Sequence, residues 1–93
     1  MNEQKPEVKK YYLDPNCEGY KEILKHPRLC YLYAKNWISE RFPDGETTIA
    51  RSGAWSFRYS TEVLMARFPE GEPAIKRSTY RNSYKKHWNI SDF

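Results

Sequence analysis

Large apolar side chains recur every four residues in three stretches of the chain. They are Leu29, Tyr33 and Trp37, then Trp55, Tyr59 and Val63, and, once one residue is deleted, Tyr80, Tyr84 and Trp88. Residues four apart lie on one face of an α-helix, so each stretch predicts a helix that buries a stripe of rings.

The three stripes belong to a longer internal repeat. The segment "ISERFPDGETTIARS", which ends at Ser52, aligns with "LMARFPEGEPAIKRS", which ends at Ser78, 26 positions later. Ile23, Ile49 and Ile75 also fall in register. Each unit therefore reads as a short helix, a turn and a longer helix, with units at 20–45, 46–71 and a shorter one at 72–93. Repeats of this length are typical of stacked helical units.

Local signals predict where the helices begin and end. Ser52 and Ser78 are favourable N-cap residues for the longer helices, and Pro27 fits the first helical position after His26. The motifs "FPDG" and "FPEG" are expected to end the long helices, with Gly45 and Gly71 in left-handed geometry. Residues 47–59 can alternatively be read as a β-hairpin that turns at Ser-Gly, although this ignores the third unit.

The predicted fold is all-α, with two full and one partial helix-turn-helix repeats forming a small bundle or a short solenoid. Residues 1–19 are expected to form an N-terminal arm and turn, with Tyr11–Leu13 as a short anchor, and residues 20–93 a single domain. The chain has 93 residues, which suits one domain. Two full units are near the lower limit for a stable stack, so a homo-oligomer is a further possibility.

Charge and cysteine content narrow the class of protein. The formal net charge is +4, and five cations against two acids give residues 72–93 a charge of +3. This excess permits acidic protein or nucleic-acid partners. Cys17 and Cys30 form no framework of disulfide spacing, and no stretch is apolar enough to span a membrane. We therefore expect a cytoplasmic, soluble protein.

No motif predicts an enzyme, a cofactor or a metal site. The chain has neither a nucleophile elbow nor a phosphate-binding loop, and the spacing of Cys17, His26, Cys30 and His87 matches no common zinc pattern. The paired acids of the two "RFP" motifs are Asp44 with Glu46 and Glu70 with Glu72. They recur beside predicted helix starts, which favours a role at the helix dipole over acid–base catalysis.

The basic third unit is the strongest functional signal in the sequence. Arg77, Arg81 and Lys85 are four residues apart and predict one stripe, beside a stripe of rings. Such a surface can attract an acidic protein, which we favour, or bind phosphates and stack on unpaired bases. It can equally be an ordinary solvated face. The candidate binding residues are Lys76, Arg77, Arg81, Tyr84, Lys85, Lys86 and Trp88.

The pattern "RFPEGE-x-x-I…W-S-x-x-Y…V-L" resembles a short helical repeat that occurs in tandem in uncharacterised phage and bacterial proteins. The resemblance covers the chain from Tyr20 onward, and the third unit departs from it after Ser78, where Arg81 and Lys85 replace rings in the undeleted register. That family carries no established chemistry, so no functional residue follows from it. The resemblance implies an all-α fold and an accessory factor of phage or prophage type.

Overall fold

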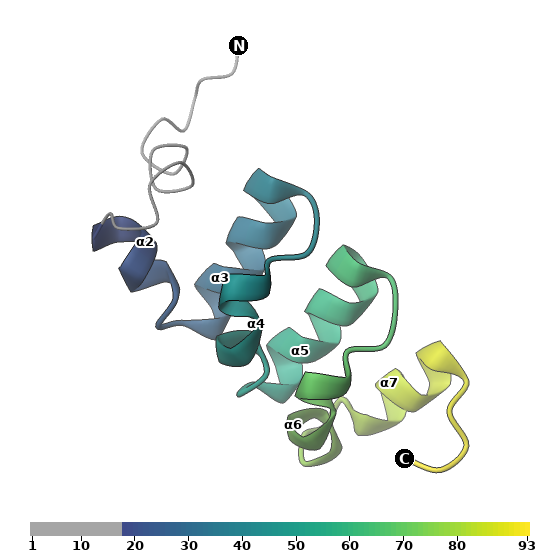
Figure 1. Cartoon of the computed structure of the whole chain (residues 1–93). Coiled ribbons are helices and arrows are strands. Elements are labelled where there is room, and N and C mark those ends of the chain that lie inside the picture. The colour runs from purple at the N-terminus through teal and green to yellow at the C-terminus, as the bar shows by residue number, and fades with distance from the viewer. Residues whose placement is uncertain (1–17) are drawn as a thin grey trace.

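The computed structural model describes residues 18–93, which contain helices and loops and no strand (Figure 1). The predicted all-α class is confirmed, and the hairpin alternative for residues 47–59 is wrong. The expected anchor at Tyr11–Leu13 and the turn after it lie outside the described residues. The elements are α2 (Glu18–Ile23), α3 (Pro27–Tyr33), η1 (Ala34–Ile38), α4 (Pro43–Ile49), α5 (Gly53–Arg58), η2 (Tyr59–Leu64), η3 (Pro69–Gly71), α6 (Glu72–Lys76) and α7 (Arg81–Trp88).

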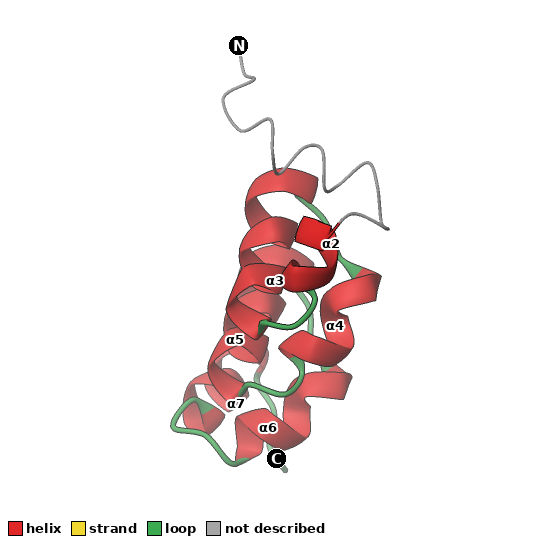
Figure 2. Cartoon of the chain, turned by 90° about the vertical axis from the view of Figure 1, so that its left-hand side faces the viewer, coloured by secondary structure: helices red, strands yellow, loops and turns green. Residues whose placement is uncertain are grey.

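The helices form two layers. The long helices, which are α3 with η1, α5 with η2, and α7, lie side by side, and the short helices α2, α4 and α6 form the second layer (Figure 2). The joints from short to long helices follow one edge, and the loops that leave the long helices follow the opposite edge (Figure 1). Equivalent loops of successive units therefore become neighbours in space.

Each predicted ring stripe supplies a buried tyrosine at its centre. Tyr33, Tyr59 and Tyr84 are at most 2% exposed. Each packs on the phenylalanine nine residues later, with ring centroids 5.0–5.1 Å apart in the pairs Tyr33–Phe42, Tyr59–Phe68 and Tyr84–Phe93. The third unit therefore keeps the internal arrangement of the others, as the one-residue deletion predicts.

Rings also join one unit to the next. Tyr31 packs on Trp55 at 5.3 Å, and at the equivalent position Phe57 stacks on Tyr80 at 5.2 Å. Aromatic pairs at these distances add about 0.5–1.5 kcal/mol beyond the area they bury. The stack of units is thus held by the same contact, repeated once per interface.

The long helices end earlier than the sequence predicts. Ser39, Met65 and Asn89 have φ values of 61°, 53° and 56°, and these residues, not glycines, provide the left-handed ends. The prediction that Gly45 and Gly71 adopt this geometry is wrong, since no glycine among the described residues has a positive φ. The helix has already ended several residues before each "RFP" motif, which therefore begins the next helical segment.

Close packing explains the glycines of these motifs. A Cβ on Gly45 would lie 2.7 Å from the Phe42 ring and 3.0 Å from the Cys30 sulfur. A Cβ on Gly71 would overlap the Ser56 hydroxyl in the same way. Real Cβ atoms do not approach other atoms this closely. Each glycine therefore allows its short helical segment to pack closely against the preceding long helix.

Two of the three long helices contain a π turn that the sequence did not predict. Met65 follows Tyr59 by six positions, whereas Asn89 follows Tyr84 by five. η1 and η2 absorb the extra residue, and α7 needs no such turn.

The two predicted serine caps have different outcomes. The Ser52 side chain accepts a hydrogen bond from the Trp55 N–H, as expected of an N-cap. α7 begins only at Arg81, so the predicted N-cap role of Ser78 is wrong. Ser78 instead donates to the Ile75 carbonyl at 2.8 Å, which is the contact that Ser56 makes to Ile49 in the second unit. In the third unit the long helix begins three residues after the serine, whereas in the second unit it begins one residue after it.

Candidate functional site

The doubled motif forms a clamp between consecutive units. In the first clamp, Arg41 donates two hydrogen bonds of 2.9 Å to the Glu46 carboxylate. The Tyr59 hydroxyl donates to Glu46 at 2.6 Å and accepts the Phe42 N–H at 2.7 Å. Because Tyr59 comes from the following long helix, the clamp holds the loop after η1 and the short helix α4 against that long helix.

The second clamp repeats the first one unit later. Arg67 donates two hydrogen bonds of 2.9 and 3.0 Å to Glu72. The Tyr84 hydroxyl donates to Glu72 at 2.7 Å and accepts the Phe68 N–H at 2.8 Å. The sequence predicted that Glu46 and Glu72 lie at helix starts, and both do lie in the first turn of a short helix. Each carboxylate in addition bonds to an arginine before the helix and to a tyrosine of the next long helix.

The clamps keep both carboxylates ionised. Burial would raise the pKa of Glu46, but the hydrogen bonds from Arg41 and Tyr59 outweigh it and hold the pKa below 4.5. Arg67 lowers the pKa of Glu72 in the same way, against the effect of burial. Burial and the bond to Glu72 raise the pKa of Tyr84 to about 12, so this hydroxyl remains a donor at neutral pH.

The clamps make the stability of the protein fall in acid. A carboxylate whose pKa is depressed on folding stabilises the fold above its unfolded pKa, and that stability is lost as the pH falls through the folded value. We expect the urea midpoint to drop steeply below pH 4.5. The double variant E46Q/E72Q should be less stable at pH 7 and show a flatter pH profile. An equally steep acid loss in that variant would contradict this role.

Tyr84, one of the predicted binding residues, does not lie on an exposed surface. Its side chain is fully buried and its hydroxyl is used by the second clamp. Trp88 is half-buried, and its indole N–H donates to the Ser60 hydroxyl at 2.9 Å. These two rings belong to the internal packing of the stack, because the ring stripe faces the preceding unit.

The predicted cations remain as a surface. Lys76, Arg77, Arg81 and Lys86 are exposed and Lys85 is half-buried. None of the five forms an ion pair with an acidic side chain of residues 18–93, whereas cations elsewhere, such as Lys35 with Glu62 at 2.8 Å, do. We call these five residues the cationic surface.

Phe93 brings two members of the cationic surface together. The Lys76 ammonium lies 5.2 Å from the Phe93 ring centroid, and Arg81 donates to the Phe93 carbonyl at 2.5 Å. Sequence reasoning missed Phe93, although its position nine residues after Tyr84 matches the Tyr–Phe spacing of the other units.

The cationic surface lies at the end of the stack. Arg81 and Lys85 occupy the positions of Ser56 and Ser60, which are fully buried under the next unit. The position of Phe57, which packs on that unit, is taken by the exposed Asn82. Polar outer faces are typical of terminal units in helical stacks. Capping requires a polar surface, however, and does not require charges of one sign.

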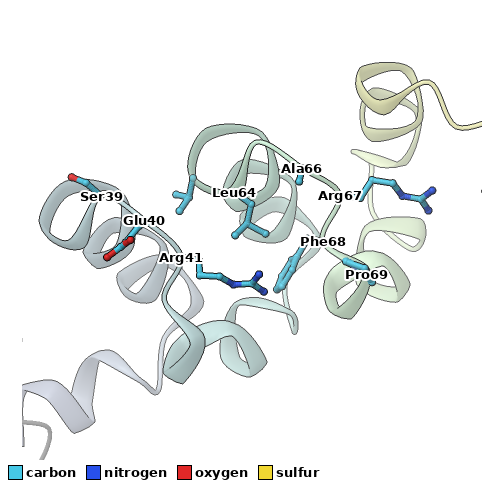
Figure 3. Close-up of a pocket in the computed structure, with 9 residues that line it drawn as sticks. Ser39, Glu40, Arg41, Leu64, Ala66, Arg67, Phe68 and Pro69 are labelled. Carbon is cyan, nitrogen blue, oxygen red and sulfur yellow. The ribbon is translucent and has the colours of Figure 1, made fainter.

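A groove opens on the opposite edge, between the loops that follow η1 and η2 (Figure 3). Its volume is about 640 Å³, and its apolar wall includes Val63, Leu64 and Phe68. Arg41 and Arg67 also line it, but both guanidinium groups are bonded to clamp carboxylates. The groove therefore presents a mixed surface, in which Ser39 and Glu40 stand beside the apolar wall, and little free positive charge.

No three metal-binding side chains among residues 18–93 lie close enough to hold an ion, and Cys17 is outside that range. None of the helices in the described part is long and apolar enough to cross a membrane.

Comparisons of the chain with protein-family models, with curated proteins and with solved structures found no significant match. The fold and the surface therefore define the protein only as a small all-α protein of stacked helical units, with a cationic end.

Proposed function

We propose that this protein is a non-enzymatic interaction factor that binds an acidic partner protein through its cationic surface. The observation that carries the proposal is that Lys76, Arg77, Arg81, Lys85 and Lys86 form no ion pair with an acidic side chain of residues 18–93. Unpaired charges of one sign steer a complementary protein and fix its orientation. A cytoplasmic accessory factor of phage or prophage type is the setting that the sequence suggests.

The arrangement of the rings favours a protein partner over single-stranded nucleic acid. Binding to unpaired bases relies on exposed aromatic side chains that stack on them. None of the Phe, Tyr or Trp side chains in residues 18–93 is exposed, and Tyr80 is stacked on Phe57. Phosphate contacts remain open to these cations, so nucleic acid is the competing outcome of the test.

A charge-reversal experiment tests the proposal. The probe is a fluorescent glutamate-rich peptide of twelve residues, and binding is measured by anisotropy at low salt. The triple variant R77E/R81E/K85E should lose affinity by about tenfold or more, because attraction becomes repulsion. The charge-conserving variant R77K/R81K/K85R should retain binding. Circular dichroism establishes that both variants are folded.

Two results would overturn the proposed function. One is unchanged peptide binding by the folded triple variant. The other is much tighter binding of an oligothymidylate with the same number of charges, lost in the same variant, since this assigns the surface to nucleic acid. Light scattering on the same samples measures whether the protein forms the homo-oligomer that the sequence analysis leaves open. Growth end to end by the contacts of the stack is disfavoured, because Arg81 and Lys85 would be buried there.

A further inference from the structure

Acidic and basic residues are segregated along the chain in all three units, and not in the third unit alone. Between residues 23 and 91, every Asp and Glu falls within 40–46 or 62–72. The segments 23–39, 47–61 and 73–91 contain none. These acid-free segments hold the three joints from a short to a long helix, whereas the acids lie in η2 and η3, in the loop after η1 and in the first turns of α4 and α6.

Each acid-free joint presents at least one arginine to solvent. Arg51 and Arg77 occupy equivalent positions, two residues after the end of α4 and one residue after the end of α6. Arg28 lies in the first turn of α3 and Arg81 begins α7. All four side chains are exposed, and none forms an ion pair with an acid of the described chain. We call these four residues the arginine row.

Direct contacts make the row continuous. A Cβ on Gly53, two residues after Arg51, would lie 2.5 Å from the Ser78 Cβ, so the second and third joints touch. The Thr48 hydroxyl near the end of α4 donates to the Leu24 carbonyl of the first joint at 2.6 Å. Successive joints are therefore packed against one another along the edge.

The thiol of Cys30 gives separate evidence for the position of Arg51. Burial raises the pKa of this thiol to about 11, and the positive charge of Arg51 opposes the rise. Cys30 lies in α3, in the unit before Arg51. The charge of Arg51 therefore acts on a residue of the helix that carries Arg28.

We propose that the arginine row binds an extended acidic segment of the partner protein, lying across all three units. This inference rests on the proposed function and deepens it. Neighbouring helices lie about 8–10 Å apart. An extended segment in the polyproline II conformation advances about 3.1 Å per residue with three residues per turn, so side chains three residues apart lie on one face about 9 Å apart. Carboxylates at that spacing would therefore meet arginines of successive units. Guanidinium groups bind carboxylates through two parallel hydrogen bonds, as both clamps of this protein do.

The surroundings of the row favour an acidic polypeptide over a nucleic acid. Glu22 lies at its start and pairs with Lys25 at 3.4 Å and His26 at 3.0 Å. The pair with Lys25 offsets a positive charge at that end, so the arginines carry the positive charge of the first two joints. No exposed aromatic ring follows the row on which bases could stack.

A matched pair of single variants tests the row. Arg51→Glu and Arg58→Glu make the same charge change at exposed positions seven residues apart, and only Arg51 belongs to the row. The probe is a twelve-residue peptide with glutamate at every third position. We expect Arg51→Glu to weaken its binding by about fivefold or more, and Arg58→Glu to change it by less than about twofold. A four-residue peptide with two glutamates should bind weakly and be insensitive to both.

The other results have separate meanings. Equal losses in both single variants would overturn the row, because the effect would be one of net charge alone. No loss in Arg51→Glu with a large loss in R77E/R81E/K85E would overturn the row and leave the proposed function standing. No loss in the triple variant is the failure of the proposed function itself. Tighter binding of an oligothymidylate of equal charge, reduced in Arg51→Glu, would overturn the assignment to an acidic polypeptide.

Discussion

Replacement of Tyr59 by phenylalanine is expected to lower the free energy of unfolding by about 3 kcal/mol. The change removes only the hydroxyl, but that hydroxyl bonds to both Glu46 and the Phe42 N–H inside the first clamp. The variant leaves a buried N–H without a partner and a buried carboxylate with one donor fewer. Losses of this kind exceed the average worth of a hydrogen bond, because each buried polar group keeps its full desolvation cost.

Tyr80→Phe is the matched control for this variant. Tyr80 is half-buried and stacked on Phe57, and its hydroxyl has no hydrogen bond among the described residues. Its replacement should change the stability by less than about 0.5 kcal/mol. Urea unfolding followed by circular dichroism compares the two variants. Equal losses in both would mean that the Tyr59 hydroxyl has no special role.

Gly53→Ala is expected to destabilise the protein, although helix propensity alone predicts the opposite. Gly53 is the first residue of α5, and alanine is the better helix former by about 1 kcal/mol. The new Cβ would lie 2.5 Å from the Ser78 Cβ and 2.7 Å from the Ala74 carbonyl oxygen. A backbone carbonyl cannot rotate away as a side chain can, so we expect a loss of about 1–3 kcal/mol.

Ser83→Ala supplies the comparison for Gly53→Ala. Ser83 is exposed on α7, where an added preference for helix should be neutral or slightly stabilising. Thermal unfolding of both variants gives the sign directly. A Gly53→Ala protein that melts at or above the temperature of the parent would contradict the close contact between the second and third joints.

The fold was largely predictable from the positions of the rings. Spacing of four fixed the helix faces, and the one-residue deletion placed Tyr84 in register with Tyr59, as the two clamps confirm. The four-residue spacing of the rings cannot predict an extra residue within a helix, because a helix with the π turns η1 and η2 buries the same stripe as a regular α-helix would. The π turns and the left-handed residues that follow them were therefore not predicted.

The helix ends show where local signals mislead. Proline and glycine in "FPDG" are typical of a helix end, yet Pro43 begins α4 and Gly45 lies within it. Propensity describes a residue by itself, whereas Gly45 is required by the atoms of Phe42 and Cys30 that press on it. That requirement arises from tertiary packing and is invisible in the local sequence.

The candidate site was predicted in part. The clustering of cations in the third unit followed from charge alone, but burial could not, so Tyr84 and Trp88 were assigned to a surface that they do not form. The clamp tyrosines were also missed as a pair with Glu46 and Glu72, although each follows its glutamate by 12 or 13 residues. Arg28 and Arg51 joined the site only when the joints were seen in contact.

The clamps give the doubled motif its meaning. Each one ties the loop that leaves a long helix to the next short helix and to the next long helix, so nearly the same motif makes the same contacts twice. The stacking of units that the clamps hold also brings the short-to-long joints, with their arginines, together along the opposite edge. The repeat therefore aligns the joints, and the joints supply the arginines of the proposed binding surface.

A double-mutant cycle tests the central claim that the two clamps are separate and equivalent sets of contacts. Coupling between Tyr59→Phe and Glu46→Gln, and between Tyr84→Phe and Glu72→Gln, should each reach about 1–3 kcal/mol. The crossed pair Tyr59→Phe with Glu72→Gln should couple by less than about 0.5 kcal/mol. Strong coupling within each clamp and none across them is the predicted result. Additive effects within a clamp, or equal coupling in the crossed pair, would contradict it.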